Sequence, residues 1–199
     1  MKKLISCFIA AAATLFIAHG AAAAEGGPDA LVKSVVDEVL AVMKQNGDRQ
    51  TLRTLAEQKI VPYFDFKQMT QMAAGRSWRD ATPAQQQALE NGFRTLLVNT
   101  YTSSLSHTSG AGKTVDIKPL ARSASQGEAL VKTLVKESGK PPTAIDYRMV
   151  NTPGGWKVVD VTIENVSLVT NYRTTFSEEV ARSGIDGLIK TIGAKNGKG

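Results

Sequence analysis

Residues 156–176, WKVVDVTIENVSLVTNYRTTF, contain the pattern that decides the fold of this chain. The first half alternates like a β-strand, so that Val159, Val161 and Ile163 point to one face and the polar residues between them to the other. The second half, residues 168–176, carries apolar side chains at helical spacing. The stretch therefore predicts a strand that passes directly into a helix, with the apolar faces of both turned toward one interior.

Three segments upstream alternate with the same period of two: residues 113–118, 129–136 and 145–149. Short connections rich in Gly, Pro, Ser and Asn separate these segments, so consecutive strands should pair antiparallel, as a meander of about four strands. One face of this sheet would be strongly apolar and the other charged. The apolar face needs a cover of other elements.

Helical periodicity precedes and follows the predicted sheet. The expected helices span residues 31–43, 52–60, 83–107, 169–180 and 185–192. Pro62 should end the second helix, because proline disfavours helical backbone at the residue before it. Thr82-Pro83-Ala84-Gln85 has the form of a capping box and should start the longest helix. The sequence thus predicts an α+β domain, with helices packed on one side of a curved antiparallel sheet.

The amino terminus predicts export. Lys2 and Lys3 precede an apolar run at residues 4–18, and small residues follow at 21–24. The run is shorter than the ~20 residues that span a bilayer, so residues 1–24 are expected to be a signal peptide cleaved after Ala23 or Ala24, and an uncleaved anchor is the alternative. Residues 25–199 would then form a single domain in the periplasm.

Composition excludes several kinds of chemistry. Cys7 is the only cysteine and His107 the only histidine beyond residue 24, so neither a disulfide, a zinc site nor a Cys-His catalytic pair is expected. We expect no metal and no cofactor. Removal of Lys2 and Lys3 lowers the formal net charge from +6 to +4, and the basic residues are scattered, so no nucleic-acid partner is expected.

Two carboxylates are candidates for a general base in a pocket enzyme, Asp65 and Asp160. The alternative for Asp65 is a helix cap, and for Asp160 a solvent-facing position on the strand. Just beside Asp65, aromatic and methionine side chains crowd at residues 63–72. They are either core filler or a pliable wall for a flexible apolar ligand.

Two segments carry a resemblance to a known family, residues 61–105 and 154–176. The first contains Tyr-Phe-Asp-Phe at 63–66, a Gly-x-x-Trp-Arg element at 75–79 and the Thr-Pro-x-Gln cap. The second contains Gly-Trp-Lys-Val-x-Asp-Val at 155–161. In this order and spacing the chain resembles the MlaC family of periplasmic phospholipid-binding proteins, also called toluene-tolerance or organic-solvent-tolerance auxiliary proteins.

The resemblance implies a fold related to nuclear transport factor 2 that encloses a deep apolar pocket for phospholipid acyl chains. It also implies a non-enzymatic carrier that moves phospholipid between an outer-membrane lipoprotein-porin complex and an inner-membrane ABC transporter with an MCE-domain subunit, and so maintains outer-membrane lipid asymmetry. We expect the carrier to be a monomer. The alternatives are a periplasmic pocket enzyme of the same fold, with an aspartate base, and an adaptor whose interior is fully packed.

No short motif of the family fixes the pocket residues, so we choose them by periodicity. The predicted lipid-binding residues are Tyr63, Phe66, Met69, Met72, Leu97, Tyr101, Leu105, Val131, Ile145, Tyr147, Met149, Val159, Val161, Ile163, Val166, Val169 and Tyr172. Arg76, Arg79 or Arg173 is a candidate for the rim, near a phosphate. Two acyl chains should require a volume at or beyond the top of the ~300–1,000 Å³ range of small-molecule pockets.

Overall fold

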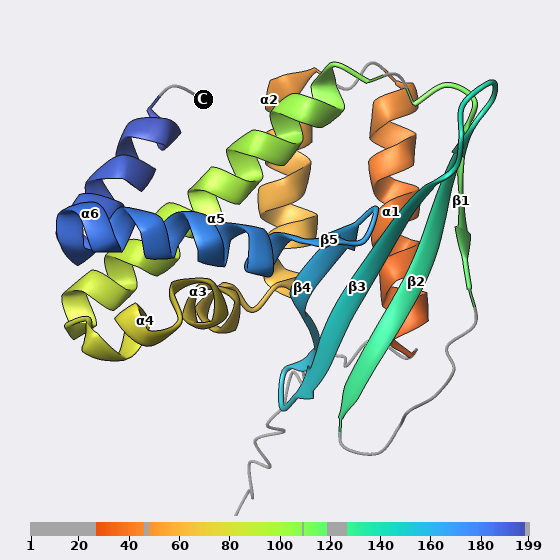
Figure 1. Ribbon diagram of the computed structural model, residues 1–199. Helices are drawn as coiled ribbons and strands as arrows, with labels where there is room; N and C mark the ends of the chain where they lie inside the picture. The colour runs from red at the N-terminus through yellow and green to blue at the C-terminus, as the bar shows by residue number, and fades with distance from the viewer. Residues whose placement is uncertain (1–26, 46–47, 109, 119–126, 198–199) are drawn as a thin grey trace, which may run out of the picture.

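A computed structural model describes residues 27–45, 48–108, 110–118 and 127–197 (Figure 1). The predicted signal peptide, residues 1–24, lies outside the described residues. The elements are α1 (Pro28–Lys44), α2 (Arg49–Leu55), a π-helical turn η1 (Ala56–Ile60), a 3-10 turn η2 (Val61–Tyr63), α3 (Phe66–Ala74), α4 (Arg76–Asp80), α5 (Pro83–Ser106), β1 (Lys113–Ile117), β2 (Glu128–Glu137), β3 (Thr143–Thr152), β4 (Gly155–Ile163), β5 (Val166–Ser167) and α6 (Leu168–Asn196).

The sheet is an antiparallel meander in the order β1-β2-β3-β4-β5, which confirms the predicted topology. The expected count of about four strands missed β5. This two-residue strand returns along β4 through a turn in which Glu164 and Asn165 adopt φ values of 47° and 64°. Two consecutive left-handed residues suit a tight hairpin. Val166, one of the predicted lipid-binding residues, therefore lies in this edge strand.

A β-bulge interrupts β4. Met149 of β3 pairs with Val158, but the preceding residue, Arg148, pairs with Asp160, so Val159 is one extra residue on β4. The extra residue shifts the side-chain alternation. Val158 and Val161 consequently pack in the same buried cluster, and the prediction that Val159 shares the face of Val161 is wrong.

Two predicted helix ends have different outcomes. The capping box is confirmed at α5, where Thr82 Oγ1 accepts the N–H of Gln85 (3.3 Å) and Gln85 Oε1 accepts the N–H of Thr82 (2.9 Å). Pro62 does not stop the second helical segment. The chain continues through η1 and η2 to Tyr63, because proline in the first positions of η2 gives up no intrahelical bond.

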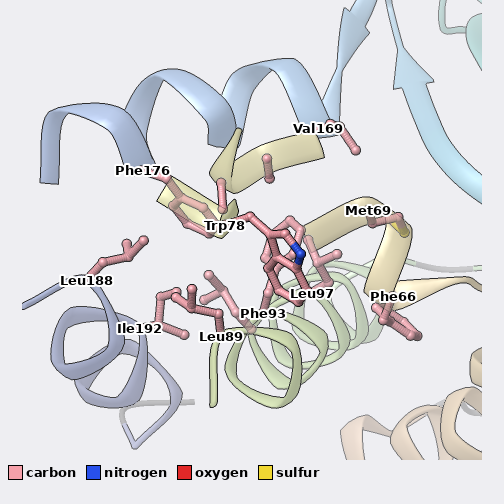
Figure 2. Close-up of a cluster of buried hydrophobic side chains, with 13 residues drawn as sticks. Phe66, Met69, Trp78, Leu89, Phe93, Leu97, Val169, Phe176, Leu188 and Ile192 are labelled. Atoms are coloured by element: carbon pink, nitrogen blue, oxygen red, sulfur yellow. The ribbon is translucent and has the colours of Figure 1, made fainter. Parts of the chain in front are cut away.

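The helices gather to one side of the sheet in Figure 1, with α1 behind β2 and β3. The first of two hydrophobic cores, called the helical cluster and shown in Figure 2, is formed by side chains of α3, α4, α5 and α6. Its buried members are Phe66, Met69, Ala73, Ala74, Trp78, Leu89, Phe93, Leu96, Leu97, Val169, Phe176, Leu188 and Ile192. Phe93 is fully buried at its centre and meets Phe176 edge to face, with ring centroids 5.2 Å apart.

A second core, the sheet cluster, lies between α1 and the sheet. Its buried members are Leu31, Val32, Val131, Met149, Val158 and Val161.

Helix α6 leaves the sheet edge at β5 and bends at Gly184, where the backbone is not helical (φ 72°, ψ −177°), so the two predicted C-terminal helices are the two arms of α6. Across the described ranges, no helix combines the length and apolarity needed to cross a bilayer.

Candidate functional site: an apolar cavity between the helices and the sheet

A cavity of about 370 Å³ lies between the concave side of the sheet and α1, α2, η1 and α5. Its walls are almost wholly aliphatic and aromatic. Three threonines also line it, Thr102, Thr108 and Thr133, but each donates its hydroxyl to a backbone carbonyl, at 2.7, 3.0 and 2.7 Å respectively. These hydroxyls are therefore already engaged, and the interior is suited to hydrocarbon.

Many of the residues chosen by periodicity come together around this cavity. Those that line it are Tyr63, Phe66, Met69, Leu97, Tyr101, Leu105, Ile145, Tyr147, Met149, Val161 and Ile163. They belong to η2, α3, α5, β3 and β4. In β3 the alternation is regular, and Ile145, Tyr147 and Met149 all face the cavity. That these residues bind lipid remains a prediction.

Six of the chosen residues lie elsewhere. Met72, Val169 and Tyr172 pack in or against the helical cluster, where the ring of Tyr172 meets that of Phe93 edge to face at 4.9 Å. Val131 is fully buried within the sheet cluster, and Val159 is buried at the bulge. Val166, opposite Ile163 on the edge strand, is 55% exposed.

The main omission from the predicted site is α1. One face of this helix supplies seven lining residues at spacings of three and four: Leu31, Val32, Val35, Val36, Val39, Leu40 and Met43. The apolar periodicity of α1 is clear in the sequence. However, a helix that covers a filled core has the same periodicity as one that covers a cavity. Further residues missed are Leu52, Leu55, Ala56, Ile60, Val61, Phe64, Val98, Thr102, Thr108, Lys113, Val115, Thr133, Val135, Val158 and Leu168.

Two tyrosines of the cavity wall, Tyr101 and Tyr147, are held neutral. Burial raises the pKa of Tyr147 to about 12. Burial, with a smaller contribution from Tyr172, raises the pKa of Tyr101 to about 12. Neither phenol supplies an acid or base in the physiological range, so the cavity wall keeps its apolar character across that range.

Neither candidate base lines the cavity. Asp65 caps α3, where its Oδ1 accepts the N–H of Gln68 at 2.8 Å. Asp160 is buried, which corrects the expectation of a solvent-facing position. Its carboxylate accepts the hydroxyl of Ser167 (2.7 Å) and the backbone N–H of Val169 (3.2 Å) at the start of α6. Both carboxylates therefore hold helix ends.

The arginines considered for the rim also lie away from the cavity lining. Arg76 is exposed and pairs with Asp80 at 3.6 Å within α4. Arg173 lies on α6 against Gly75, where a Cβ would stand 3.4 Å from its Nε. Within the ranges that the structure describes, no group of three His, Cys, Asp or Glu side chains is arranged to hold a metal ion.

The volume of the cavity differs from another expectation. About 370 Å³ falls near the lower end of the ~300–1,000 Å³ range, not at its top. Val36, Val39 and Leu40, in the middle of α1, line the cavity and are half-buried, in contrast to the buried Leu31 and Val32 near the start of the helix.

Comparison with known proteins gives consistent results. A toluene tolerance protein of Pseudomonas putida, Ttg2D, is 30% identical over 114 residues, which are 57% of this chain and 51% of that protein. The alignment thus covers about half the length of that relative. A phospholipid-binding protein from Ralstonia solanacearum, solved in complex with a phospholipid, is 37% identical, with a TM-score of 0.78 over 87% of this chain and 98% of that one. The MlaC protein family matches residues 33–194, so the predicted resemblance is confirmed and the chain belongs to the MlaC family.

Proposed function

We propose that this protein is a phospholipid carrier and that the acyl chains of its ligand occupy the cavity between α1 and the sheet. The observation that carries the proposal is the apolar lining: side chains from seven helical elements, the turns η1 and η2 included, and from four strands face one space. The similarity to a structure solved with a phospholipid supports it. An adaptor with a fully packed interior is not compatible with this space.

The energetics of lipid transfer fit such a lining. Two acyl chains of roughly 15 methylenes, at about 0.8 kcal/mol each, represent roughly 24 kcal/mol of apolar transfer, so a lipid does not leave a bilayer for water unaided. A carrier must offer an apolar space of similar free energy and then release the lipid. Burial without many directed polar contacts meets both needs, because it is non-directional.

A diacyl lipid exceeds the ligands that a cavity of about 370 Å³ encloses, so one wall has to move outward during uptake. We propose that this wall is α1. The half-buried Val36, Val39 and Leu40 give up little packing when the helix shifts, whereas the sheet on the opposite side is fixed by strand pairing.

The proposal includes no catalytic step. The two aspartates that could act as bases accept hydrogen bonds from helix ends and lie outside the lining. We further propose the wider role that the family resemblance implies: a periplasmic monomer that exchanges phospholipid between an outer-membrane lipoprotein-porin complex and an inner-membrane ABC transporter with an MCE-domain subunit, and so maintains lipid asymmetry.

Native mass spectrometry of protein purified from bacterial cells tests the binding, together with uptake of labelled phospholipid from vesicles. A protein–phospholipid complex is expected in the first measurement and lipid transfer to the protein in the second. Protein that purifies free of phospholipid and takes none from vesicles would refute the proposal. Cross-linking in the periplasm tests the membrane partners separately.

A further inference from the structure

Lys113 is the one charged residue among those that line the cavity in the described part of the chain. Its side chain is only 9% exposed. Because Lys113 and Val115 are two positions apart on β1, both point to the concave face of the sheet. Burial of a lysine ammonium in an apolar wall costs free energy unless the ammonium has ion-pair or hydrogen-bond partners.

The ammonium of Lys113 donates to Glu137 Oε2 at 2.7 Å, across the first register pair of β1 and β2. Glu137 also pairs with Lys140, whose Nζ lies 2.9 Å from Oε1. These two lysines hold the pKa of Glu137 below its ordinary value, and Lys113 is the larger cause. The trio carries a net charge of +1. An ammonium has three donors, so Lys113 can bind a second acceptor without losing Glu137.

This trio lies at an end of the cavity that reaches solvent. Thr108, at the carboxyl end of α5, lines the cavity and is exposed. The N–H of Lys113 donates to the carbonyl of Gly110 (3.3 Å), and Gly110 in turn lies against Met43 at the end of α1. A ligand with its hydrocarbon between α1 and the sheet can therefore place a polar end beside Lys113 and still keep it hydrated.

We propose that Lys113 binds the phosphate of a phospholipid whose chains lie in the cavity, and that it makes the protein prefer phosphate-bearing lipids over uncharged ones with the same chains. The inference rests on the proposed function. Phosphate oxygens accept short, charge-assisted hydrogen bonds from an ammonium, and desolvation of the lysine by the apolar wall strengthens them. The threonines of the wall cannot substitute, because their hydroxyls are engaged with backbone carbonyls.

The competing explanation is that Lys113 and Glu137 form only a structural cross-strand pair. The same two strands provide a matched control, because Lys136 and Asp116 pair on the convex face with side chains 48% and 54% exposed. Loss of Lys136 removes an ion pair from the same strand pair and changes nothing in the cavity.

The experiment measures uptake of phosphatidylglycerol and of diacylglycerol with identical acyl chains from phosphatidylcholine vesicles by the full chain. For Lys113→Met we expect the ratio of phosphatidylglycerol to diacylglycerol bound to fall by about tenfold, the effect of losing one charge-assisted hydrogen bond. Lys136→Met should leave the ratio unchanged, and Lys113→Arg should restore most of it. Glu137→Gln breaks the pair but keeps the ammonium, so its ratio should stay at or above that of the unaltered protein.

An unchanged ratio in Lys113→Met overturns the inference, as does a fall in Glu137→Gln that equals the fall in Lys113→Met, because a purely structural pair predicts the latter. If Lys113→Met fails to fold, Lys113→Arg and Glu137→Gln still decide the question. Failure of the proposed function gives a different result, since the unaltered protein would then take up neither lipid.

Discussion

Asp160 on β4 accepts the backbone N–H of Val169 in α6 at 3.2 Å, and so joins the sheet to the start of the helix that covers its edge. The same carboxylate accepts the hydroxyl of Ser167, which itself caps α6 by accepting the N–H of Thr170 at 3.0 Å. A strand residue thus acts as a second cap for a helix nine positions further on.

We predict that Asp160→Ala lowers the free energy of unfolding by about 2 kcal/mol, because it leaves the buried N–H of Val169 without its acceptor and removes the shorter of the two hydrogen bonds that the Ser167 hydroxyl donates. Urea denaturation measures this loss. Lipid uptake by the folded variant should be unchanged, since Asp160 lies outside the cavity lining. A variant with full stability and no uptake would give Asp160 a chemical role and contradict the proposal. Asp146→Ala, on the same convex face, is the control.

Gly110 should not tolerate a side chain. A Cβ there would lie 2.7 Å from the Cβ of Met43, 2.8 Å from its carbonyl carbon and 2.9 Å from the backbone nitrogen of Lys44. Because two of these atoms are backbone, they cannot move aside cheaply, and Gly110→Ala should cost about 1–3 kcal/mol of stability. Gly193→Ala in α6, where a Cβ meets nothing within 4 Å, should be neutral or slightly stabilising. Equal melting temperatures for the two variants would contradict this.

Ile163→Glu should abolish most lipid uptake, because it places a carboxylate in the apolar lining. The side chain is half-buried, so we expect the variant to remain folded. Leu130→Glu is the matched control, since Leu130 is 45% exposed on the convex face of β2. Vesicle uptake assays, with circular dichroism to verify folding, compare the two. Normal uptake by folded Ile163→Glu would show that the acyl chains lie elsewhere.

Alkaline titration should reveal the raised pKa of Tyr147. Burial raises its folded-state pKa to about 12, above the ordinary value of 10.0, so the folded protein holds the phenol proton more tightly than the unfolded chain does. The neutral phenol of Tyr147 therefore makes its full contribution to the free energy of unfolding below pH ~10, and this contribution is lost as the pH rises toward ~12. Phenolate absorbance near 295 nm and urea midpoints measured across this window provide the test. Tyr147→Phe should weaken the loss; an identical pH dependence in that variant would contradict the assignment.

Local patterns predicted much of the fold. The Thr82–Gln85 capping box and the alternation of Ile145, Tyr147 and Met149 depend on residues near one another in the chain, and both are found. The bulge at Val159 could not be predicted this way, because the extra residue is defined by the register of β3, which offers no opposite residue. Tyr172 and Val169 have the periodicity of cavity residues but pack on Phe93 and its neighbours. The spacing of apolar residues in one helix does not show which other helix they will contact.

The site itself was harder to predict than the fold. A valine of α1 has the same sequence pattern whether the space opposite it is filled or open, so residues such as Val36 and Leu40 gave no indication of the cavity. Lys113 was missed for a different reason. It is paired with Glu137 across two strands, and neither its burial nor its partner can be read from the segment that contains it.

The two cores of the protein border the cavity to different extents. In the helical cluster Phe66, Met69 and Leu97 line the cavity, but Phe93, Phe176 and Leu188 are buried outside its lining. In the sheet cluster only Val131 of the buried members lies outside the lining. The part of the helical cluster around Phe93 is therefore set apart from whatever lies against the sheet. In the proposed carrier, this separation would let lipid enter and leave while the packing between α5 and α6 stays in place.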